Sequence, residues 1–530
     1  MSEANNHAVL ITSSRNVLVD IEGIDMEIEA WELLRLFYDS ERIHFNCAAM
    51  DGAPAGNGDS AENPEGKSST DYLYIKVSEN DELWNCRVCL YTGISLPFDS
   101  KSDPDYFSEK TVCHSELKKP GGKLFERRKI LVGSCVARIM AEYTGKKLPY
   151  GSLLGVRPVK LAMQCVNDNM DREETIRRLN VLSGINPEKA ELLYNIAMVE
   201  KPFLREDEKA VHLYIGIPFC ASRCLYCSFT AYPIKRYRDL VASYTEALIR
   251  EAEHAAGWIS RNGCHIGSVY VGGGTPTSID AESLYKILRA LVSSFDLDGC
   301  EFTVEAGRPD TITEDKLQAM LENNVTRISI NPQTMNEETL KLIGRNHTPR
   351  DIEDKFYMAR RLGFDNINMD IIAGLPGEDL SMFRKTLDKI EDMQPESLTV
   401  HTLAFKRASR LREENFRFSP VPDNIVEDMI NEARGSAAKI GMRPYYLYRQ
   451  KNILANLENT GYCRPGYECI YNIHTMEEVQ TLIALGAGAV SKFVYPEENR
   501  IERVFNPKDV GLYISRIDEV MERKEVHFNR

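Results

Sequence analysis

The chain has 530 residues, of which 43% are apolar and 27% are charged, and its formal net charge is −14. This length predicts roughly two to four domains, and the acidic balance argues against electrostatic binding to nucleic acid. The first residues lack the basic and apolar regions of a signal peptide, and no apolar run approaches the roughly 20 residues that span a bilayer. We therefore expect a cytoplasmic protein whose 13 cysteines bind metal or are buried rather than form disulfides.

Residues 1–165 predict a small N-terminal α+β domain. The segments VLVDIEG, DYLYIKV and ELWNCRVCLYT have strand character, and a long helix is expected to end at Gly145. Residues 46–70 are poor in large apolar side chains and rich in Gly, Ser, Asn and Pro, which predicts a flexible insertion. Residues 166–205 have a helical pattern, and we expect them to link this domain to the next.

From Val211 onwards, apolar strands alternate with amphipathic helices. The expected strands are HLYIGIPF, SVYVGGG, EFTVEA, RISINPQ, NINMDIIAGLP and SLTVHTLAF. Six β/α repeats in this order predict an α/β fold, with a parallel sheet curled into a partial (β/α)6 TIM-like barrel over residues 206–430. The chemistry of such barrels lies at the C-terminal ends of the strands. For residues 431–530 we expect a mainly helical region that covers the substrate.

Three cysteines follow the first of these strands. Cys220, Cys224 and Cys227 have the spacing C-x3-C-x2-C within GIPFCASRCLYCSF. Three thiolates can hold three irons of a 4Fe–4S cluster and leave the fourth iron open to an outside ligand. A structural zinc ion normally needs a fourth protein ligand, and this loop has no fourth Cys or His. A zinc site and a set of unrelated buried cysteines are the two alternatives.

This loop, with Tyr226 directly before its third cysteine, resembles the signature of the radical S-adenosylmethionine (SAM) superfamily. In that superfamily the open iron binds the amine and carboxylate of SAM. The segment GGGTPT at 272–277 follows the second expected strand, and its glycines allow the backbone to approach a ligand closely. It resembles the superfamily segment that binds the methionine end of SAM, although a triple glycine alone also fits a tight turn.

Over roughly residues 210–500 the chain is similar to the oxygen-independent coproporphyrinogen III oxidases, also called coproporphyrinogen dehydrogenases. The similarity rests on successive strand ends, namely YIGIPFC, YVGGGTPT, FTVEAGRPD, RISINPQTMN, GRNHT, NMDIIAGLPGE and HTLAF. The N-terminal extension, GVRPVKL and YYLYRQKN resemble the extended HemZ branch of this family.

The resemblance implies the residues that bind the cofactors. Tyr214, Gly273 and Glu305 are expected to contact a cluster-bound SAM, and Val490 is expected to line the same site. Positions associated in the family with a second SAM molecule are Tyr226, Gly274, Thr275, Gln333, Arg345, Asp370 and Ala404. Each match has a structural alternative.

These alternatives concern single side chains. Glu305 and Asp370 are also suited to be helix N-caps or ion-pair partners of Arg308 and Arg345. Gln333 is equally suited to cap a turn. Tyr214 and Val490 also fit a plain barrel core.

The resemblance also implies a reaction. An external one-electron donor such as flavodoxin or ferredoxin reduces the cluster, and SAM is cleaved to methionine and a 5′-deoxyadenosyl radical. The radical removes a hydrogen atom from the β-carbon of a propionate, and loss of CO2 and one electron leaves a vinyl group. Two such rounds convert coproporphyrinogen III to protoporphyrinogen IX in haem biosynthesis.

Such a substrate carries four carboxylates and needs fixed cations. The candidates are Arg407, Arg410, Arg443, Arg449 and Lys451. Three neighbouring tyrosines are suited either to pack a macrocycle or to form ordinary core, namely Tyr445, Tyr446 and Tyr448.

Two positions depart from the family pattern. Gly216 stands where many members have His, and Phe229 stands where characterised dehydrogenases often have another Cys. Phe is common there among haem chaperones, so a haem-binding chaperone is one alternative function. A radical SAM methyltransferase that degrades haem is another. The chaperone segment H-N-x-x-Y-W is absent from this chain, and YYLYRQKN favours the dehydrogenase branch over both alternatives.

Other cysteines and histidines carry weaker signals. Cys86 and Cys89 lie in a strand-like segment and are interpreted as structural. The pair in GYCRPGYEC fits either ordinary burial or a second metal site, and consists of Cys463 and Cys469. His347 and His401 lie at strand or loop ends and are candidate proton donors, and His347 equally fits a solvated turn.

Overall fold

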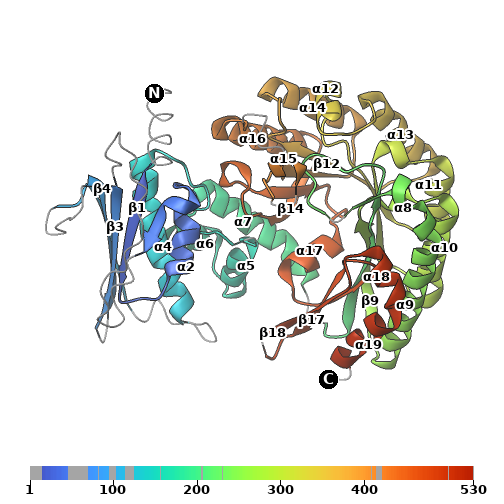
Figure 1. Ribbon diagram of the computed structural model, residues 1–530, viewed down its shortest axis with the longest axis horizontal. Helices are drawn as coiled ribbons and strands as arrows, with labels where there is room; N and C mark the ends of the chain where they lie inside the picture. Colours follow the sequence, from blue (N-terminus) through green and yellow to red (C-terminus); the bar gives the residue numbers. More distant parts are fainter. Residues whose placement is uncertain are drawn as a thin grey trace, which may run out of the picture. The chain divides into compact units, whose positions relative to one another are not determined.

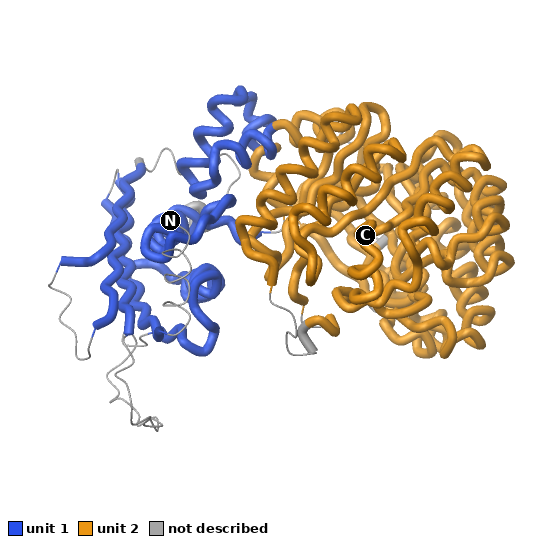
Figure 2. Tube along the Cα trace, turned by 90° about the horizontal axis from the view of Figure 1, so that it is seen from above, with its two compact units in different colours: residues 1–155, 164–194 blue, residues 156–163, 195–530 orange. Residues whose placement is uncertain are grey.

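The computed structural model describes residues 15–45, 70–80, 83–94, 103–113, 124–155, 157–204, 207–229, 231–406, 409–413, 420–498 and 500–528. The chain divides into two compact units, residues 1–155 with 164–194 and residues 156–163 with 195–530, which Figure 2 colours separately. The predicted barrel and C-terminal regions therefore belong to one unit. The boundary between residues 194 and 195 falls inside the predicted linker, whereas residues 156–163 of the predicted N-terminal domain belong to the second unit. The predicted flexible insertion lies outside the described residues except for Thr70.

The first unit is an α+β fold around a five-stranded sheet of order β2-β1-β3-β4-β5. Its elements are β1 (Asn16–Glu22), α2 (Glu27–Leu34), β2 (Ile43–Phe45), β3 (Thr70–Glu79), β4 (Leu83–Ile94), β5 (Tyr106–Cys113), α4 (Leu124–Thr144), α6 (Arg172–Ser183) and α7 (Pro187–Glu200), whose last turns belong to the second unit. Buried residues alternate along β3, and Leu73 and Ile75 share one core with helices α2 and α4. Cys86 and Cys89 of β4 are both buried.

The second unit contains the predicted partial barrel. All six predicted strands are present, as β6 (Ala210–Ile217), β9 (His265–Gly273), β10 (Glu301–Gly307), β11 (Arg327–Ile330), β12 (Ile367–Ala373) and β13 (Ser397–Thr402). They are neighbours in chain order and pair in parallel. Within the described residues the sheet is open, because its order runs from β14 to β18 with no pairing between these edges. The predicted partial (β/α)6 barrel is therefore present.

Helices separate the strands and cover the outside of the sheet (Figure 1). They are α9 (Val241–Arg261), α10 (Ala281–Ser294), α11 (Glu314–Glu322), α12 (Glu337–Leu342), α13 (Pro349–Leu362), α14 (Leu380–Met393) and α16 (Asp423–Lys439). Short elements follow individual strands, namely β7 (Phe219–Cys220), β8 (Tyr232–Pro233), α8 (Ile234–Tyr237) and α15 (Arg410–Glu413). No helix in the described part of the chain is long and apolar enough to cross a membrane.

The inner face of the sheet is polar. On β12, Met369 and Ile371 join the apolar core under the helices, whereas Asn368 and Asp370 alternate with them and face the barrel interior. Strands β6 and β9 pair residue by residue, and Tyr214 lies opposite Tyr270 in this register. Polar groups need partners when they are removed from water, so this inner face is the natural place for a site.

The prediction of a mainly helical region at residues 431–530 is wrong. The region contains the strands β14 (Arg443–Tyr448), β15 (Asn459–Cys463), β16 (Thr481–Leu485), β17 (Val490–Tyr495) and β18 (Arg500–Phe505). It also contains the helices α17 (Ile470–Glu477), α18 (Val510–Ser515) and α19 (Ile517–Phe528). Strand β15 extends the barrel sheet beside β13, and β16 extends it beside β6. These strands are five or six residues long, too short to show a clear period before their sheet partners are known.

The segment GVRPVKL contributes to a charge cluster at the end of α17. The buried carboxylate of Glu478 accepts hydrogen bonds or ion pairs from Arg157, from Lys492 at 2.8 Å, from Arg503 at 3.4 Å and from Lys160 at 3.8 Å. Burial would raise the pKa of Glu478, but Lys492 and Arg157 lower it to about 2. One carboxylate therefore holds four cations in place.

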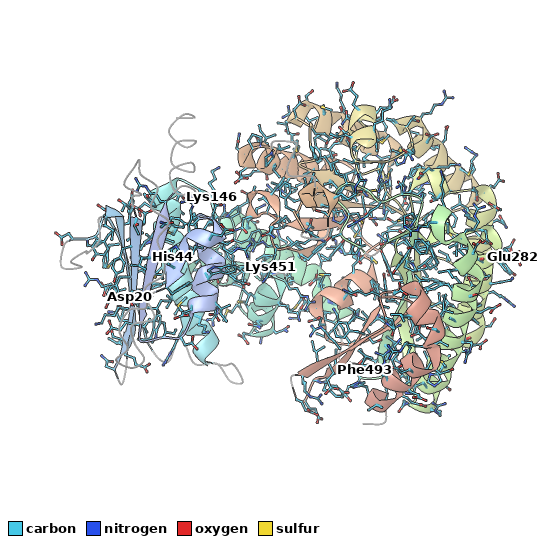
Figure 3. The ribbon with its side chains drawn as sticks, in the orientation of Figure 1. Asp20, His44, Lys146, Glu282, Lys451 and Phe493 are labelled. Atoms are coloured by element: carbon cyan, nitrogen blue, oxygen red, sulfur yellow. The ribbon has the colours of Figure 1, made fainter. Side chains whose placement is uncertain are left out.

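We predict that Glu478→Ala destabilises the protein by about 2 kcal/mol, because it leaves partly buried cations without their counter-charge. Urea unfolding at neutral pH measures this change. The matched control is Glu282→Ala, since Glu282 lies on the outer side of α10 in an exposed pair with Lys286 (Figure 3) and such pairs contribute little. Equal stability of the two variants would contradict a structural role for the cluster.

Candidate functional site

The three predicted cluster ligands lie on one loop after β6, which we call the cysteine loop (residues 218–229). Cys220 and Cys224 are buried and Cys227 is partly exposed. The loop is anchored at its start, where Cys220 in β7 pairs with Pro233 in β8. It is anchored again where Leu225 donates its N–H to the carbonyl of Ile343.

Two buried arginines contact the sulfur of Cys224. The Arg308 guanidinium donates to Cys224 Sγ at 3.7 Å and to Ser222 Oγ at 2.8 Å. It is held by two parallel bonds to Asp310, at 2.9 and 2.8 Å. Arg345 also hydrogen-bonds Cys224. These guanidinium groups place positive charge beside the Cys224 side chain.

Arg345 extends from the cysteine loop to the strand β11 side of the site. Its guanidinium donates to the hydroxyl of Tyr226 at 3.2 Å and to the backbone carbonyl of Asn331. The side chain is buried, and its Nε has no hydrogen-bond partner among the described residues. Burial opposes its charge, but the neighbouring Tyr226 and Cys224 raise the pKa of Arg345, so the group stays cationic.

Cys220 lies against the glycine segment. Its sulfur is 3.1 Å from Thr275 Oγ1, and the Thr275 N–H donates to the carbonyl of Phe219 at 2.7 Å. Burial raises the pKa of Cys220 to about 11 and raises that of Cys227 as well. Iron binding requires the thiolates, so a cation-rich setting around this loop assists the uptake of a metal cluster.

The glycines at 272–274 bring the backbone close to both the cysteine loop and the carboxylate of Glu305. A Cβ on Gly274 would lie 2.4 Å from the carbonyl oxygen of Phe219, and Gly273 has φ of +113°. A Cβ on Gly272 would lie 3.2 Å from Glu305 Oε2. Only glycine fits this passage without displacing a neighbour.

Two carboxylates occupy the inner face beside this segment. Tyr270 donates to Glu305 Oε1 at 2.6 Å. Burial raises the pKa of Glu305 to about 7, and the charge of Asp370 contributes to the rise. Asp370 accepts from Asn368 at 2.8 Å and lies 3.7 Å from Nε2 of His401.

His401 and the surrounding tyrosines complete this group. The other ring nitrogen of His401, Nδ1, is 3.1 Å from the hydroxyl of Tyr448. Although burial favours protonation of Asp370, pairing with His401 and Asn368 lowers its pKa. Tyr471 of α17 stacks on Tyr270 with ring centroids 4.5 Å apart and on Tyr214 at 6.3 Å.

Most of the predicted residues therefore gather at one end of the barrel. Tyr226, Arg345 and Cys224 form one contact set, and Thr275 with Cys220 forms another. A second group holds Tyr214, Glu305 and Asp370 with the glycine segment. Gln333 has a left-handed φ of 68°, and its N–H donates to the carbonyl of Asp370 at 2.9 Å.

Two predicted residues lie outside these contact sets. Ala404 is buried and forms a β-bridge with Ile453. Val490 begins β17 and pairs with Phe505. The loop before Val490 does reach the site, because a Cβ on Gly486 would lie 2.3 Å from the carbonyl oxygen of Gly216.

The structural alternatives for the carboxylates do not match these contacts. Arg308 pairs with Asp310 rather than Glu305, and Arg345 contacts Tyr226 and Asn331 rather than Asp370. The carboxylates that cap nearby helices are other residues, such as Asp280 and Asp379.

The predicted substrate cations are more dispersed. Arg443 pairs with Glu468 at 2.9 Å, and the buried Arg449 donates to the carbonyls of Leu457 and Asn456. Arg410 and Lys451 are exposed, and Arg407 lies outside the described residues. The tyrosines Tyr445 and Tyr446 are buried core, whereas Tyr448 contacts His401.

The remaining candidates are buried. Cys463 and Cys469 belong to an apolar cluster, and Cys469 Sγ donates to Glu301 at 3.1 Å. His347 is 3.9 Å from Asp310, and burial lowers its pKa to about 4. Among the described residues, no three His, Cys, Asp or Glu side chains converge as the ligands of a single metal ion.

The cysteine loop nevertheless has the donors of a 4Fe–4S cluster. Each cysteine of such a cluster binds a different iron, so its sulfurs need not converge on one point. The buried cations at Cys224 supply positive charge where thiolates and a cluster would place negative charge. By donor chemistry and charge, these residues fit the cluster.

Several contributors were not recognised as such from the sequence. The sequence suggests Arg308 only as an ion-pair partner of a carboxylate, and it indicates no role for Tyr270 or Tyr471. The position of Arg308 directly after the third barrel strand, in VEAGRPD, was the available signal. Tyr471 lies 201 residues from Tyr270 in the chain and on a helix, so no local pattern connects them.

Comparison with known proteins identifies the class. Residues 214–390 match the radical SAM superfamily. The oxygen-independent coproporphyrinogen-III oxidase-like protein HemZ of Bacillus subtilis is 42% identical over 405 residues, which are 76% of this chain and 81% of HemZ. The heme chaperone HemW of Lactococcus lactis is 30% identical over 287 residues, 53% of this chain and 69% of HemW. The structure of coproporphyrinogen III oxidase (HemN) from Escherichia coli aligns with a TM-score of 0.48 and 22% identity, over 61% of this chain and 72% of HemN.

The chain is thus a radical SAM protein, a class that uses a 4Fe–4S cluster and SAM. Within this superfamily it belongs to the oxygen-independent coproporphyrinogen III oxidase-like proteins of the HemZ branch.

Glu305 gives a pH prediction for the cofactor-free protein. Folded Glu305 keeps its proton up to about pH 7, whereas the unfolded residue loses it near its ordinary pKa of 4.5. Its contribution to the free energy of unfolding is therefore fully present below pH 4.5 and is lost as the pH rises through 7. We expect Glu305→Gln to gain stability relative to wild type between pH 5 and pH 7.5, as measured by anaerobic urea unfolding. The exposed-site control, Glu282→Gln, should show no such trend, and a parallel trend in both variants would contradict the assignment.

His401 gives a prediction for its carboxylate partner. Because His401 lowers the pKa of Asp370, His401→Phe should raise it, and 13C NMR of labelled aspartate measures the change. The control is His44→Phe, at an exposed position in the first unit (Figure 3). An unchanged Asp370 titration in His401→Phe would show that the two side chains do not interact.

Proposed function

We propose that this protein catalyses the oxygen-independent oxidative decarboxylation of coproporphyrinogen III to protoporphyrinogen IX. The observation that carries the proposal is the arrangement at the strand ends, where the cysteine loop, the glycine segment and Glu305 lie against one another. Membership of the HemZ branch supports the substrate class. We expect the protein to act in porphyrin biosynthesis.

In this proposal Cys220, Cys224 and Cys227 would hold the cluster, and the cluster with SAM would supply radical chemistry for hydrogen removal from the substrate. Gly273 and Glu305 hold the methionine end of SAM, with Tyr214 and Val490 beside it. Glu305, with a pKa of about 7, is partly ionised at neutral pH and then accepts hydrogen bonds from an ammonium group. The aromatic side chains around it exclude water.

A second SAM is part of the proposal, at the positions carried over from the family. Arg345 supports this second site, because its buried Nε has no hydrogen-bond partner among the described residues. The other guanidinium nitrogens donate to a backbone carbonyl and a tyrosine hydroxyl rather than to a carboxylate. Two contacts support the proposal: Arg345 donates to the hydroxyl of Tyr226, and the Gln333 N–H donates to the carbonyl of Asp370. Gly274, Thr275 and Ala404 complete the set.

The specific test is an anaerobic assay. The reconstituted protein is given reductant, SAM and coproporphyrinogen III, and mass spectrometry follows 5′-deoxyadenosine and the stepwise loss of two carboxyl groups. Formation of protoporphyrinogen IX supports the proposal. Formation of 5′-deoxyadenosine without decarboxylation would contradict this substrate and direct attention to haem.

A heme chaperone is the second candidate, because HemW of Lactococcus lactis is 30% identical. Phe229, which is 66% exposed beside the cysteine loop, is the residue that favours it. Haem affinity separates the candidates: a chaperone should bind haem tightly and consume no SAM, whereas the proposed decarboxylase should turn over SAM with porphyrinogen.

We predict that replacing Cys220, Cys224 or Cys227 singly by Ala abolishes both the visible absorbance of the 4Fe–4S cluster and SAM cleavage. Each cysteine binds its own iron, so no remaining thiol can substitute. The matched control is Cys264→Ala, at a partly exposed cysteine outside the site. Retained SAM cleavage in any of the three variants would refute the ligand assignment.

A further inference from the structure

A single buried arginine joins the cysteine loop to the end of strand β10. Nη1 of Arg308 donates to the backbone carbonyl of Ser222 at 3.2 Å, to Ser222 Oγ at 2.8 Å and to Cys224 Sγ at 3.7 Å. The Arg308 side chain is only 3% exposed, so these bonds form away from bulk water. Hydrogen bonds in such surroundings are electrostatically stronger than the same bonds in water.

Asp310 fixes the direction of this guanidinium. It accepts from Nε of Arg308 at 2.9 Å and from Nη2 at 2.8 Å. Two such bonds to one carboxylate hold the planar guanidinium in one orientation. The remaining nitrogen, Nη1, is therefore held towards the cysteine loop.

The sulfurs of the cysteine loop differ in the donors that they contact. Cys224 Sγ accepts from Arg308, and the guanidinium of Arg345 also hydrogen-bonds Cys224. Cys220 Sγ instead contacts the neutral hydroxyl of Thr275 at 3.1 Å. Charged donors thus meet the loop at Cys224 and a neutral donor meets it at Cys220.

The net charge at this contact comes from three ionised groups. Burial opposes the charge of Arg308, but its bonds to Asp310 and the neighbouring Cys224 raise its pKa, so it stays cationic, as Arg345 does. His347 lies 3.9 Å from Asp310, but burial lowers the pKa of this histidine to about 4, so it is neutral at pH 7. Two guanidinium groups therefore face one carboxylate beside the Cys224 sulfur.

We propose that Arg308 raises the reduction potential of the 4Fe–4S cluster through its bond to Cys224, and that Asp310 limits this effect. The inference rests on the proposed function, because it requires a cluster at the three cysteines. Reduction adds one negative charge to a cluster, and a nearby cation or an N–H donor to a ligand sulfur stabilises this more negative state. The carboxylate of Asp310 has the opposite charge and acts in the opposite sense.

Arg308 is thereby a positioning residue that acts through a cluster ligand. A higher potential makes the reduced cluster easier to form, and the proposed reaction starts from that state. Asp310 has two effects, since it aims the Arg308 donor at the sulfur and offsets part of its charge. Removal of Arg308 and removal of the Asp310 charge should therefore shift the potential in opposite directions.

The test is an anaerobic redox titration of the reconstituted full-length protein, without SAM or substrate. Dithionite with viologen mediators sets the potential, and EPR of the reduced cluster gives the midpoint potential. The variants are Arg308→Gln, which removes the charge, Arg308→Lys, which keeps it, and Asp310→Asn, which removes the opposing charge. The controls are Arg360→Gln and Glu396→Gln, because Arg360 of α13 makes two bonds of 2.7 Å to Glu396 in a similar pair outside the cysteine loop.

We expect Arg308→Gln to lower the midpoint potential, so that the ratio of reduced to oxidised cluster at the wild-type midpoint falls about tenfold, or about 59 mV for one electron. Arg308→Lys should lower it less, because an ammonium group keeps the charge without the fixed fork. Asp310→Asn should raise it, since Arg308 keeps its acceptors on Ser222 and loses the opposing charge. Both controls should keep the wild-type value.

Unchanged midpoints in Arg308→Gln and Asp310→Asn, or shifts in the same direction, would overturn the proposal, as would equal shifts in the controls. A purely structural pair would lower the cluster content of both variants without opposite shifts. If Arg308→Gln binds no cluster, the signs of the shifts in Arg308→Lys and Asp310→Asn decide.

Failure of the proposed function has a different signature. Opposite shifts in a protein that leaves coproporphyrinogen III intact would contradict the proposed reaction and support the role of Arg308. A wild-type protein that binds no cluster at all would overturn both.

Discussion

The sulfur of Cys224 lies between two buried guanidinium groups, and the site depends on this arrangement. Arg308 has its counter-charge in Asp310, but the bonds of Arg345 go to a hydroxyl, a carbonyl and the sulfur itself. A buried cation without a carboxylate is costly unless an anion is nearby. Three thiolates with a 4Fe–4S cluster would supply anionic groups of this kind, so in the proposed function the arginines and the cysteine loop stabilise each other once metal is bound.

The barrel makes this arrangement possible. Its parallel strands end at one edge, and each strand end supplies a different part: the cysteine loop after β6, the glycine segment after β9, Arg308 after β10 and Arg345 beyond β11. The inner face behind them carries polar side chains in register, with Glu305 bonded to Tyr270 and Asp370 close to His401. Two carboxylates in similar surroundings thus have different pKa values, raised for Glu305 and lowered for Asp370.

The sequence was sufficient to predict the barrel and the cysteine loop, because both are local patterns. All six strands were found, since each is an apolar run followed by a recognisable turn. Contacts between distant residues were not predictable: Arg308 reaches Cys224 across 84 residues, and Tyr471 reaches Tyr270 from a later helix. The strands of the C-terminal region were missed for a related reason, as β15 and β16 are identifiable only beside their partners β13 and β6.

The most direct test of the central claim uses coproporphyrinogen III deuterated at the β-carbons of its propionates. After anaerobic turnover, 5′-deoxyadenosine is isolated and its deuterium content is measured by mass spectrometry. The account predicts deuterium in 5′-deoxyadenosine together with loss of CO2 from the same substrate. Unlabelled 5′-deoxyadenosine, or decarboxylation without any 5′-deoxyadenosine, would contradict it.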